Sequence, residues 1–231
     1  MDPRPGPGTR QPDRQGDRSL NAIAIETATR PGSVAVQGNR GRRVENLSSH
    51  STQARELLPT VQRLSSEVGT TVQQVSDVFV GTGPGSYTGL RVGIATALGL
   101  AYATGATLRA VPSFEALAFD SLKPTEEGFI AWNARAQRFY FARYLRTEED
   151  VACLVPPRIV RGSQLRELLK ESLPIFGDAT VVEAAELNAD IAERLREDVF
   201  PSAGGVLALG PRRERRSLDE VEPLYLREFG A

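Results

Sequence analysis

Apolar and polar residues alternate near the beginning of the chain, and the pattern then changes to helical spacing. Three short runs, Leu20 to Glu26, Ser33 to Gln37 and Arg43 to Leu47, have strand character and are separated by turn residues. From about Ser51 to Val68 the apolar residues recur three and four positions apart, which predicts a helix with one buried face. Three strands followed by a helix indicate an α/β protein.

Helix and strand continue to alternate in the rest of the chain. A strand at Val78 to Val80, a helix from about Tyr87 to Thr104 and a strand at Thr107 to Val111 complete the element order of a ribonuclease-H-like half. Further elements are predicted at 129–133, 138–145, 151–155, 163–173 and 175–177, with short helices near 190–197 and 202–209. Actin-like proteins pair two such halves. We therefore predict an actin-like (ribonuclease-H-like) α/β fold of two subdomains with mixed sheets, residues 20–112 and a smaller subdomain, residues 113–231.

The beginning of the chain differs in composition from the rest. Residues 1–19 contain mostly Pro, Gly, Arg, Asp and Gln, with too little apolar surface to offset the entropy of ordering, so we expect a disordered tail. This stretch also lacks the apolar segment of a secretory signal peptide. No apolar run reaches membrane-spanning length without polar breaks. We therefore expect a cytoplasmic protein without membrane contact.

Charge and rare residue types exclude several kinds of site. The chain has 231 residues and a formal net charge of -1, which argues against a surface that coats nucleic acid. The single cysteine, Cys153, excludes an internal disulfide and a Cys-rich metal site, and the single histidine, His50, excludes a His-pair metal motif. No carboxylate pair has a spacing that requires acid/base catalysis. We expect no catalytic residue and no metal site.

A glycine-rich run, Gly81 to Gly93, follows an apolar strand and opens a helix. Such a turn presents backbone N–H groups near a helix N-terminus, which is a common way to bind an anion. However, the run lacks the lysine of a P-loop and the Gly-x-Ser-x-Gly spacing of a nucleophile elbow. A structural turn is therefore favoured over a phosphate cradle. The residues of this signature turn are Gly83, Pro84, Gly85, Ser86, Thr88, Gly89 and Arg91.

The sequence of this turn, GPGSYTGLRVG, closely resembles the signature of the TsaB (YeaZ) family, usually written GPGS[FY]TGLR[IV]G. Three further segments agree in order and spacing. They are the strand, loop and strand at 22–36, His50-Ser51 with Glu56-Leu57-Leu58-Pro59, and Glu222 to Arg227. The resemblance extends from about Leu20 to Arg227. It implies an actin-like fold, in agreement with the element order.

The resemblance also implies a function. TsaB-like proteins are non-catalytic scaffold subunits of the complex that adds threonylcarbamoyl to N6 of adenosine 37 in tRNAs reading ANN codons. Such a subunit binds and supports the TsaD subunit, so a TsaD homologue is the expected partner. A TsaE homologue and a second copy of the chain are further candidates, and contact with tRNA is expected to be indirect or weak. The resemblance implies no cofactor, apart from a nucleotide at the interface with TsaD.

Two helices carry the expected partner interface. Small residues recur every four positions in the second helix and therefore share one face: Gly89, Gly93, Ala97 and Ala101. Apolar residues form a stripe on the preceding helix: Leu57, Val61 and Leu64. Small faces allow helices to approach closely. The resemblance favours a partner surface here, whereas the simpler interpretation is an internal core.

A stand-alone actin-like ATPase or phosphotransferase is the alternative function. In such enzymes the loop after the first strand binds phosphate, and the corresponding residues here are Glu26, Thr27 and Thr29. The TsaB family usually has Asp in place of Glu26 and of Asn133, so both positions depart from it. A longer carboxylate disturbs a tight octahedral magnesium site, and the amide removes a carboxylate. These residues therefore predict a degenerate phosphate loop. The charged run Arg212 to Arg216 is expected to be a solvated linker rather than a tRNA contact.

Overall fold

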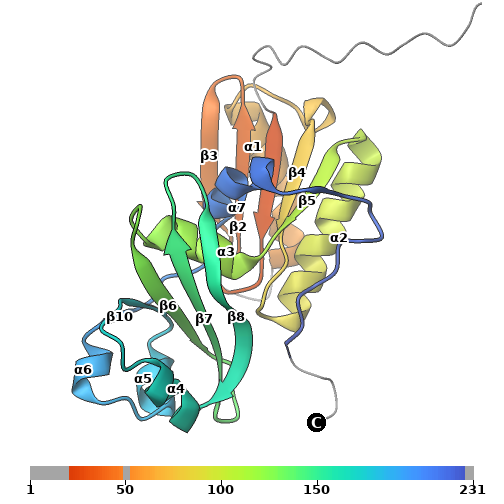
Figure 1. Ribbon diagram of the computed structural model, residues 1–231. Coiled ribbons are helices and arrows are strands. Elements are labelled where there is room, and N and C mark those ends of the chain that lie inside the picture. Colours follow the sequence, from red (N-terminus) through yellow and green to blue (C-terminus); the bar gives the residue numbers. More distant parts are fainter. Residues whose placement is uncertain (1–20, 49–52, 227–231) are drawn as a thin grey trace, which may run out of the picture.

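The computed structural model describes residues 21–48 and 53–226, which form two β-sheets with helices around them (Figure 1). The expected tail, residues 1–19, lies outside the described residues, and so does His50. Among the described residues, no helix has both the length and the apolar character that crossing a membrane requires.

The first sheet has six strands in the order β11-β5-β4-β1-β2-β3. The strand bounds are β1 Ala22–Glu26, β2 Ser33–Gly38, β3 Gly41–Asn46, β4 Asp77–Gly81, β5 Thr107–Val111 and β11 Arg215–Arg216. The first three strands are antiparallel neighbours, whereas β4 is parallel to β1 and β5 is parallel to β4. Because β1 and β4 are central and covered on both faces, every residue in them is buried.

The second sheet repeats this arrangement with the order β10-β9-β6-β7-β8. Its strands are β6 Glu127–Asn133, β7 Arg138–Arg146, β8 Val151–Arg161, β9 Ile175–Gly177 and β10 Leu195–Arg196. Again the first strand of the half, β6, is central. On one side β6, β7 and β8 pair antiparallel in turn, and on the other side β9 and β10 run parallel to β6. Two halves of the same topology make the actin-like α/β fold, which confirms the predicted fold class.

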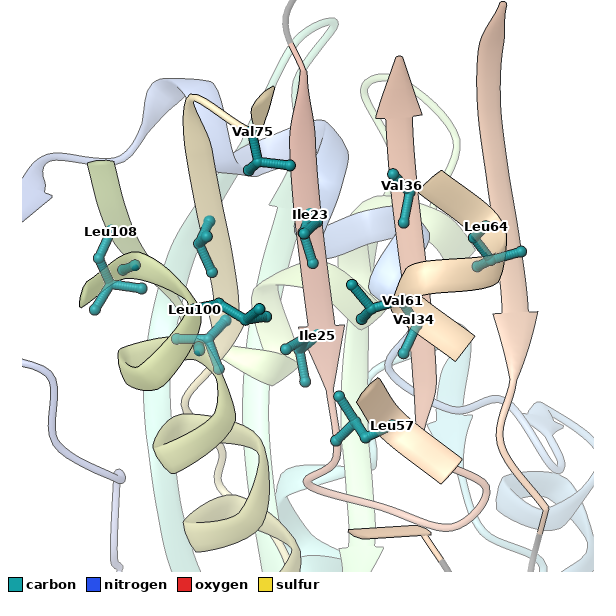
Figure 2. Close-up of a cluster of buried hydrophobic side chains, with 14 of the residues drawn as sticks. Ile23, Ile25, Val34, Val36, Leu57, Val61, Leu64, Val75, Leu100 and Leu108 are labelled. Atoms are coloured by element: carbon teal, nitrogen blue, oxygen red, sulfur yellow. The ribbon is translucent and has the colours of Figure 1, made fainter. Parts of the chain in front are cut away.

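Helices cover both faces of the first sheet. Their bounds are α1 Gln53–Glu67, α2 Tyr87–Thr104, α3 Ser113–Ser121 and α7 Ala203–Leu209, with short 3-10 turns at Val72–Gln74 and Gly210–Arg212. On one face, Ile23 and Ile25 of β1 point toward α1 and α2 and form the core with Leu57 and Val61 (Figure 2). The alternate residues of β1 are alanines, which leave room for α7 on the opposite face.

The second half has its own core beneath three short helices, α4 Gly162–Leu168, α5 Thr180–Ala184 and α6 Ala189–Ala192. A single helix expected near 190–197 is wrong, because α6 ends at Ala192 and the chain then extends into β10. Helix α3 joins the two halves, since Phe114 and Leu117 pack against Trp132 and Tyr144 of the second sheet. The division of the chain at residue 112 stays a prediction. Helix α7 and strand β11 come late in the sequence but lie on the first sheet.

The charged run Arg212 to Arg216 is not a solvated linker throughout. Arg215 and Arg216 form β11, and the Arg213 guanidinium donates to Glu115 Oε2 at 2.7 Å and to Asp150 Oδ1 at 2.8 Å. The side chains of Arg213 and Glu115 are only about one fifth exposed. Burial raises the pKa of Glu115, and the positive charge of Arg213 opposes that rise. The ion pairs therefore connect the segment before β11 to α3 and to the turn between β7 and β8.

We predict that Arg213→Gln lowers the free energy of unfolding by about 2 kcal/mol, because it leaves the mostly buried Glu115 without its counter-ion. The measurement is urea unfolding at pH 7. Arg215→Gln is the matched control, since this exposed arginine forms no ion pair among the described residues, and it should change stability by less than about 0.5 kcal/mol. Equal losses in the two variants would contradict the assignment.

Candidate functional site

A cleft of about 670 Å³ lies between the two halves. It is lined by Ala28–Arg30, Gly85–Thr88, Trp132–Arg135, Tyr140, Phe200 and Leu224–Leu226. The cleft thus brings together the loop after β1, the signature turn, the end of β6 and the segment that follows β11. None of the described residues that line it is a carboxylate, and no group of three metal-ligating side chains occurs in the described part of the chain.

The signature turn is shaped by close contact with the loop after β1. A Cβ at Gly85 would overlap the carbonyl of Ala28, and one at Gly89 would overlap the carbonyl of Thr27. Gly83 has a φ of +97°, a conformation that other residues adopt only with strain. The glycines at these positions are therefore explained by packing and backbone conformation within the chain.

Three backbone donors of the turn are used internally. The N–H of Gly83 donates to Ser113 Oγ at 2.9 Å, and the N–H of Ser86 donates to the carbonyl of Ala28 at 2.7 Å. Ser86 is the N-cap of α2, where its Oγ accepts from the N–H of Gly89 at 3.3 Å. These three groups are not available to a phosphate, so the geometry favours the structural turn over a cradle.

Glu26 lies below the cleft rather than in it. Its side chain is fully buried, and Oε1 accepts from the N–H of Ala28 at 2.6 Å. Oε2 lies against Gly81, where any side chain would collide with it, and has no hydrogen-bond partner. Burial raises the pKa of Glu26 to about 7. In this position the carboxyl group cannot reach a cation in the cleft.

The other two residues of the degenerate phosphate loop have different surroundings. Thr27 is buried, and its hydroxyl donates to the carbonyl of Gly89 at 2.8 Å, which fixes the end of β1 to the first turn of α2. Thr29 is 5% exposed and belongs to the cleft lining, and its Oγ1 has no hydrogen-bond partner. Only Thr29 of the three therefore lines the cleft.

Asn133 lies across the cleft at the end of β6. Its Nδ2 donates to Thr180 Oγ1 at 3.0 Å, and its Oδ1 accepts from the N–H of Arg135 at 2.8 Å. Its backbone N–H donates to Asp178 Oδ2 at 2.8 Å. The Asn133 amide thus holds the turn between β6 and β7 in place. The Asp178 carboxylate accepts a hydrogen bond from the backbone of the same residue.

The signature turn meets the segment around Tyr225 at the edge of the cleft. The Arg91 guanidinium lies 4.1 Å from the ring centre of Tyr87, and the rings of Tyr87 and Tyr225 are 5.2 Å apart. The N–H of Leu224 donates to the carbonyl of Thr82 at 2.7 Å. The sequence did not indicate Tyr87 and Tyr225 as site residues, although it identified the segment Glu222 to Arg227 as a motif.

The expected partner face points inward, which is a correction. Leu57, Val61, Leu64, Ala97 and Ala101 are each at most 3% exposed and belong to the core. Gly93 is buried against Thr27, and Gly89 is half-buried there. The four-residue spacing correctly identified one face of α2, but that face packs on the sheet. The exposed residues of α2 are Tyr87 and Thr88 in its first turn, followed by Arg91, Ala95, Gly99, Tyr102 and Ala103.

Fold and cleft define an actin-like protein of two similar halves, and no described residue that lines the cleft between them is a carboxylate. The family model described as TsaD: tRNA N6-adenosine threonylcarbamoyltransferase matches residues 48–202. The chain is 29% identical to the TsaB protein of Escherichia coli, over 90% of this chain and 95% of that one, and 28% identical to the TsaB protein of Bacillus subtilis, over 78% and 80%. The solved structure of YeaZ from Pseudomonas aeruginosa aligns with a TM-score of 0.76 at 24% identity, over 89% of this chain and 99% of that one. This chain belongs to the TsaB (YeaZ) family.

We predict that Glu26→Gln changes how stability depends on pH. The folded state favours protonated Glu26, so this group stabilises the fold below its ordinary pKa of 4.5, and the contribution is lost as the pH rises through about 7. Relative to the wild type, Glu26→Gln should therefore gain about 3 kcal/mol of unfolding free energy between pH 4.5 and pH 8. Urea unfolding at several pH values measures this difference. A constant difference over that range would show that Glu26 does not titrate there.

A second prediction compares two glycines of the same helix. Gly93→Ala should lower the free energy of unfolding by about 1–3 kcal/mol, because the added methyl group overlaps Thr27 Oγ1 at the end of β1. Gly99→Ala should raise it by up to about 1 kcal/mol, because nothing lies within 4 Å of the new Cβ and alanine favours a helix. Thermal unfolding of both variants tests this contrast. Similar shifts of the two melting temperatures would refute it.

Proposed function

We propose that this chain is a non-catalytic subunit in the biosynthesis of threonylcarbamoyladenosine in tRNA, and that it binds and supports a TsaD homologue. Its relatives in Escherichia coli and Bacillus subtilis are both named tRNA threonylcarbamoyladenosine biosynthesis protein TsaB. Membership in that family supports the role in tRNA modification. The TsaD partner and the scaffold role rest on the surface described next.

The observation that carries this proposal is the outward face of α2. Helix α2 has 18 residues and a single charged side chain, Arg91. Its inner face fills the core between the helix and the sheet (Figure 2). Its outer face carries Ala95, Gly99 and Ala103 at four-residue spacing, beside Tyr102, which is 81% exposed. A helix that is apolar on both sides and exposed on one is typical of a partner surface.

The chemistry of this face fits a helix of another protein. Alanine and glycine allow two helices to approach closely, and an aromatic side chain beside them supplies the contact area of an interface anchor. A second copy of this chain would use the same face, so a homodimer competes with the TsaD complex. A TsaE homologue as a further partner and a nucleotide at the interface with TsaD stay predictions.

The ATPase alternative is less well supported by the cleft. Phosphoryl transfer requires carboxylates that hold magnesium beside the phosphates. Glu26 is buried below the cleft, Asn133 has no charge, and no described residue of the lining is acidic. The turn beside the cleft also uses the N–H groups of Gly83 and Ser86 internally. These features favour a subunit that acts through its surfaces.

We predict that Tyr102→Ala weakens binding to the TsaD homologue of the same organism by roughly thirtyfold, which corresponds to the loss of about 2 kcal/mol for an interface anchor. Isothermal titration calorimetry measures the affinity, and circular dichroism should be unchanged because the side chain is exposed. Leu154→Ala is the matched control, since Leu154 is 46% exposed on β8 in the other half. Normal binding by Tyr102→Ala, or an equal loss in the control, would reject this face as the interface.

A further inference from the structure

Two arginines lie opposite each other on neighbouring strands of the second sheet. Arg138 at the start of β7 and Arg161 at the end of β8 are direct partners in the antiparallel pairing. Directly opposed residues lie on the same face of a sheet, and two like charges in this position destabilise the pairing. Both side chains are exposed, and neither forms an ion pair within residues 21–48 and 53–226. The fold thus places two arginines opposite each other, and neither has an ion-pair partner among the described residues.

A third arginine reaches the same place from the next helix. Helix α4 begins directly after β8, and Arg166 lines a depression of about 390 Å³ together with Arg138 and Arg161. Arg166 donates to the carbonyl of Ala185 at 2.6 Å and lies 3.7 Å from Glu186, whose side chain is 85% exposed. The lining thus contains three arginines and one carboxylate, which lies near Arg166. This local excess of positive charge contrasts with the formal net charge of -1 for the whole chain.

We propose that this depression binds the phosphate groups of an RNA backbone. A guanidinium group matches phosphate oxygens with two parallel hydrogen bonds, and directly opposed strand residues are only about 5 Å apart at Cα. Arg138 and Arg161 can therefore hold one phosphate together, or two successive ones. A bound phosphate also removes the repulsion between them, so the arrangement is more stable when it is occupied.

The lining also argues against a lipid surface. Proteins that bind a lipid surface usually insert apolar side chains beside their basic ones. Here the remaining lining residues are small or polar: Ala136, Gln137, Gly162, Ser163 and Ala184. The carboxylates of an acidic peptide form the same paired hydrogen bonds with arginine as phosphates do, and the experiment below separates these two ligands. The choice of RNA as the carrier of the phosphates rests on the proposed function in tRNA modification.

The depression is separate from the proposed TsaD surface. It is formed by β7, β8 and α4 of the second half, whereas α2 lies beside the first sheet (Figure 1). Binding of RNA and binding of TsaD can therefore be tested independently on the same chain.

The test measures the affinity of the full chain for a fluorescently labelled, unmodified tRNA transcript by anisotropy between 50 and 200 mM salt. The double variant Arg138→Gln/Arg161→Gln should bind at least tenfold more weakly, and its slope of log affinity against log salt should fall by roughly two, one for each lost phosphate contact. The control Arg215→Gln/Arg216→Gln removes the same charge from exposed residues of the first half and should bind as the wild type does. Circular dichroism and thermal unfolding verify that both double variants fold.

Several outcomes would overturn the proposal. Equal losses in the two double variants would indicate a general effect of charge, and competition by polyglutamate as strong as by RNA would indicate an acidic peptide. Binding of the wild type to anionic vesicles but not to RNA would indicate a lipid surface. The variant should still bind the TsaD homologue normally. Loss of TsaD binding by Tyr102→Ala with normal RNA binding would support two separate binding sites. Failure of the wild type to bind TsaD would reject the proposed function and not the RNA site.

Discussion

The close approach of the loop after β1 to the first turns of α2 determines much of this structure. The carbonyls of Thr27 and Ala28 occupy the space that side chains at positions 89 and 85 would need. Only glycine permits this contact, so the signature of the family describes a packing requirement. The contact fixes the direction of α2 on the sheet and thereby decides which of its faces remains outside.

The same contact uses part of what a phosphate would otherwise bind. The N–H of Ser86 donates to the carbonyl of Ala28 instead of to a ligand, and the N–H groups of Gly83 and Gly89 donate to Ser113 and to the N-cap. Beneath them, Glu26 is so deeply buried that its carboxyl group is neutral over part of the physiological pH range. Internal packing thus uses groups that bind phosphate in other proteins with a turn of this kind, which supports the proposal that this chain acts through its outer surfaces.

The sequence predicted the elements well and their orientation less well. Alternation and helical spacing located the strands and the long helices, and the order of elements was enough for the fold class. Because α2 is apolar on all sides, its periodicity could not show which face meets the sheet, and Gly93, Ala97 and Ala101 were assigned to the wrong side. The pairing of Arg213 with Glu115 and the opposition of Arg138 and Arg161 depend on strand register and on contacts between distant segments. No local pattern contains that information.

The proposed scaffold role requires binding surfaces at a fixed distance from one another, and the contacts between the halves would meet this requirement. Helix α3 packs against the first sheet through α7 and against the second sheet through Phe114 and Leu117. Arg213 adds ion pairs from the end of the chain to α3 and to Asp150 in the second half. Domain closure around a ligand needs a hinge with few packed side chains, whereas this junction is buried and charge-paired. Under the proposed function, the duplicated fold would therefore hold the outer face of α2 and the arginine depression at a fixed distance from each other.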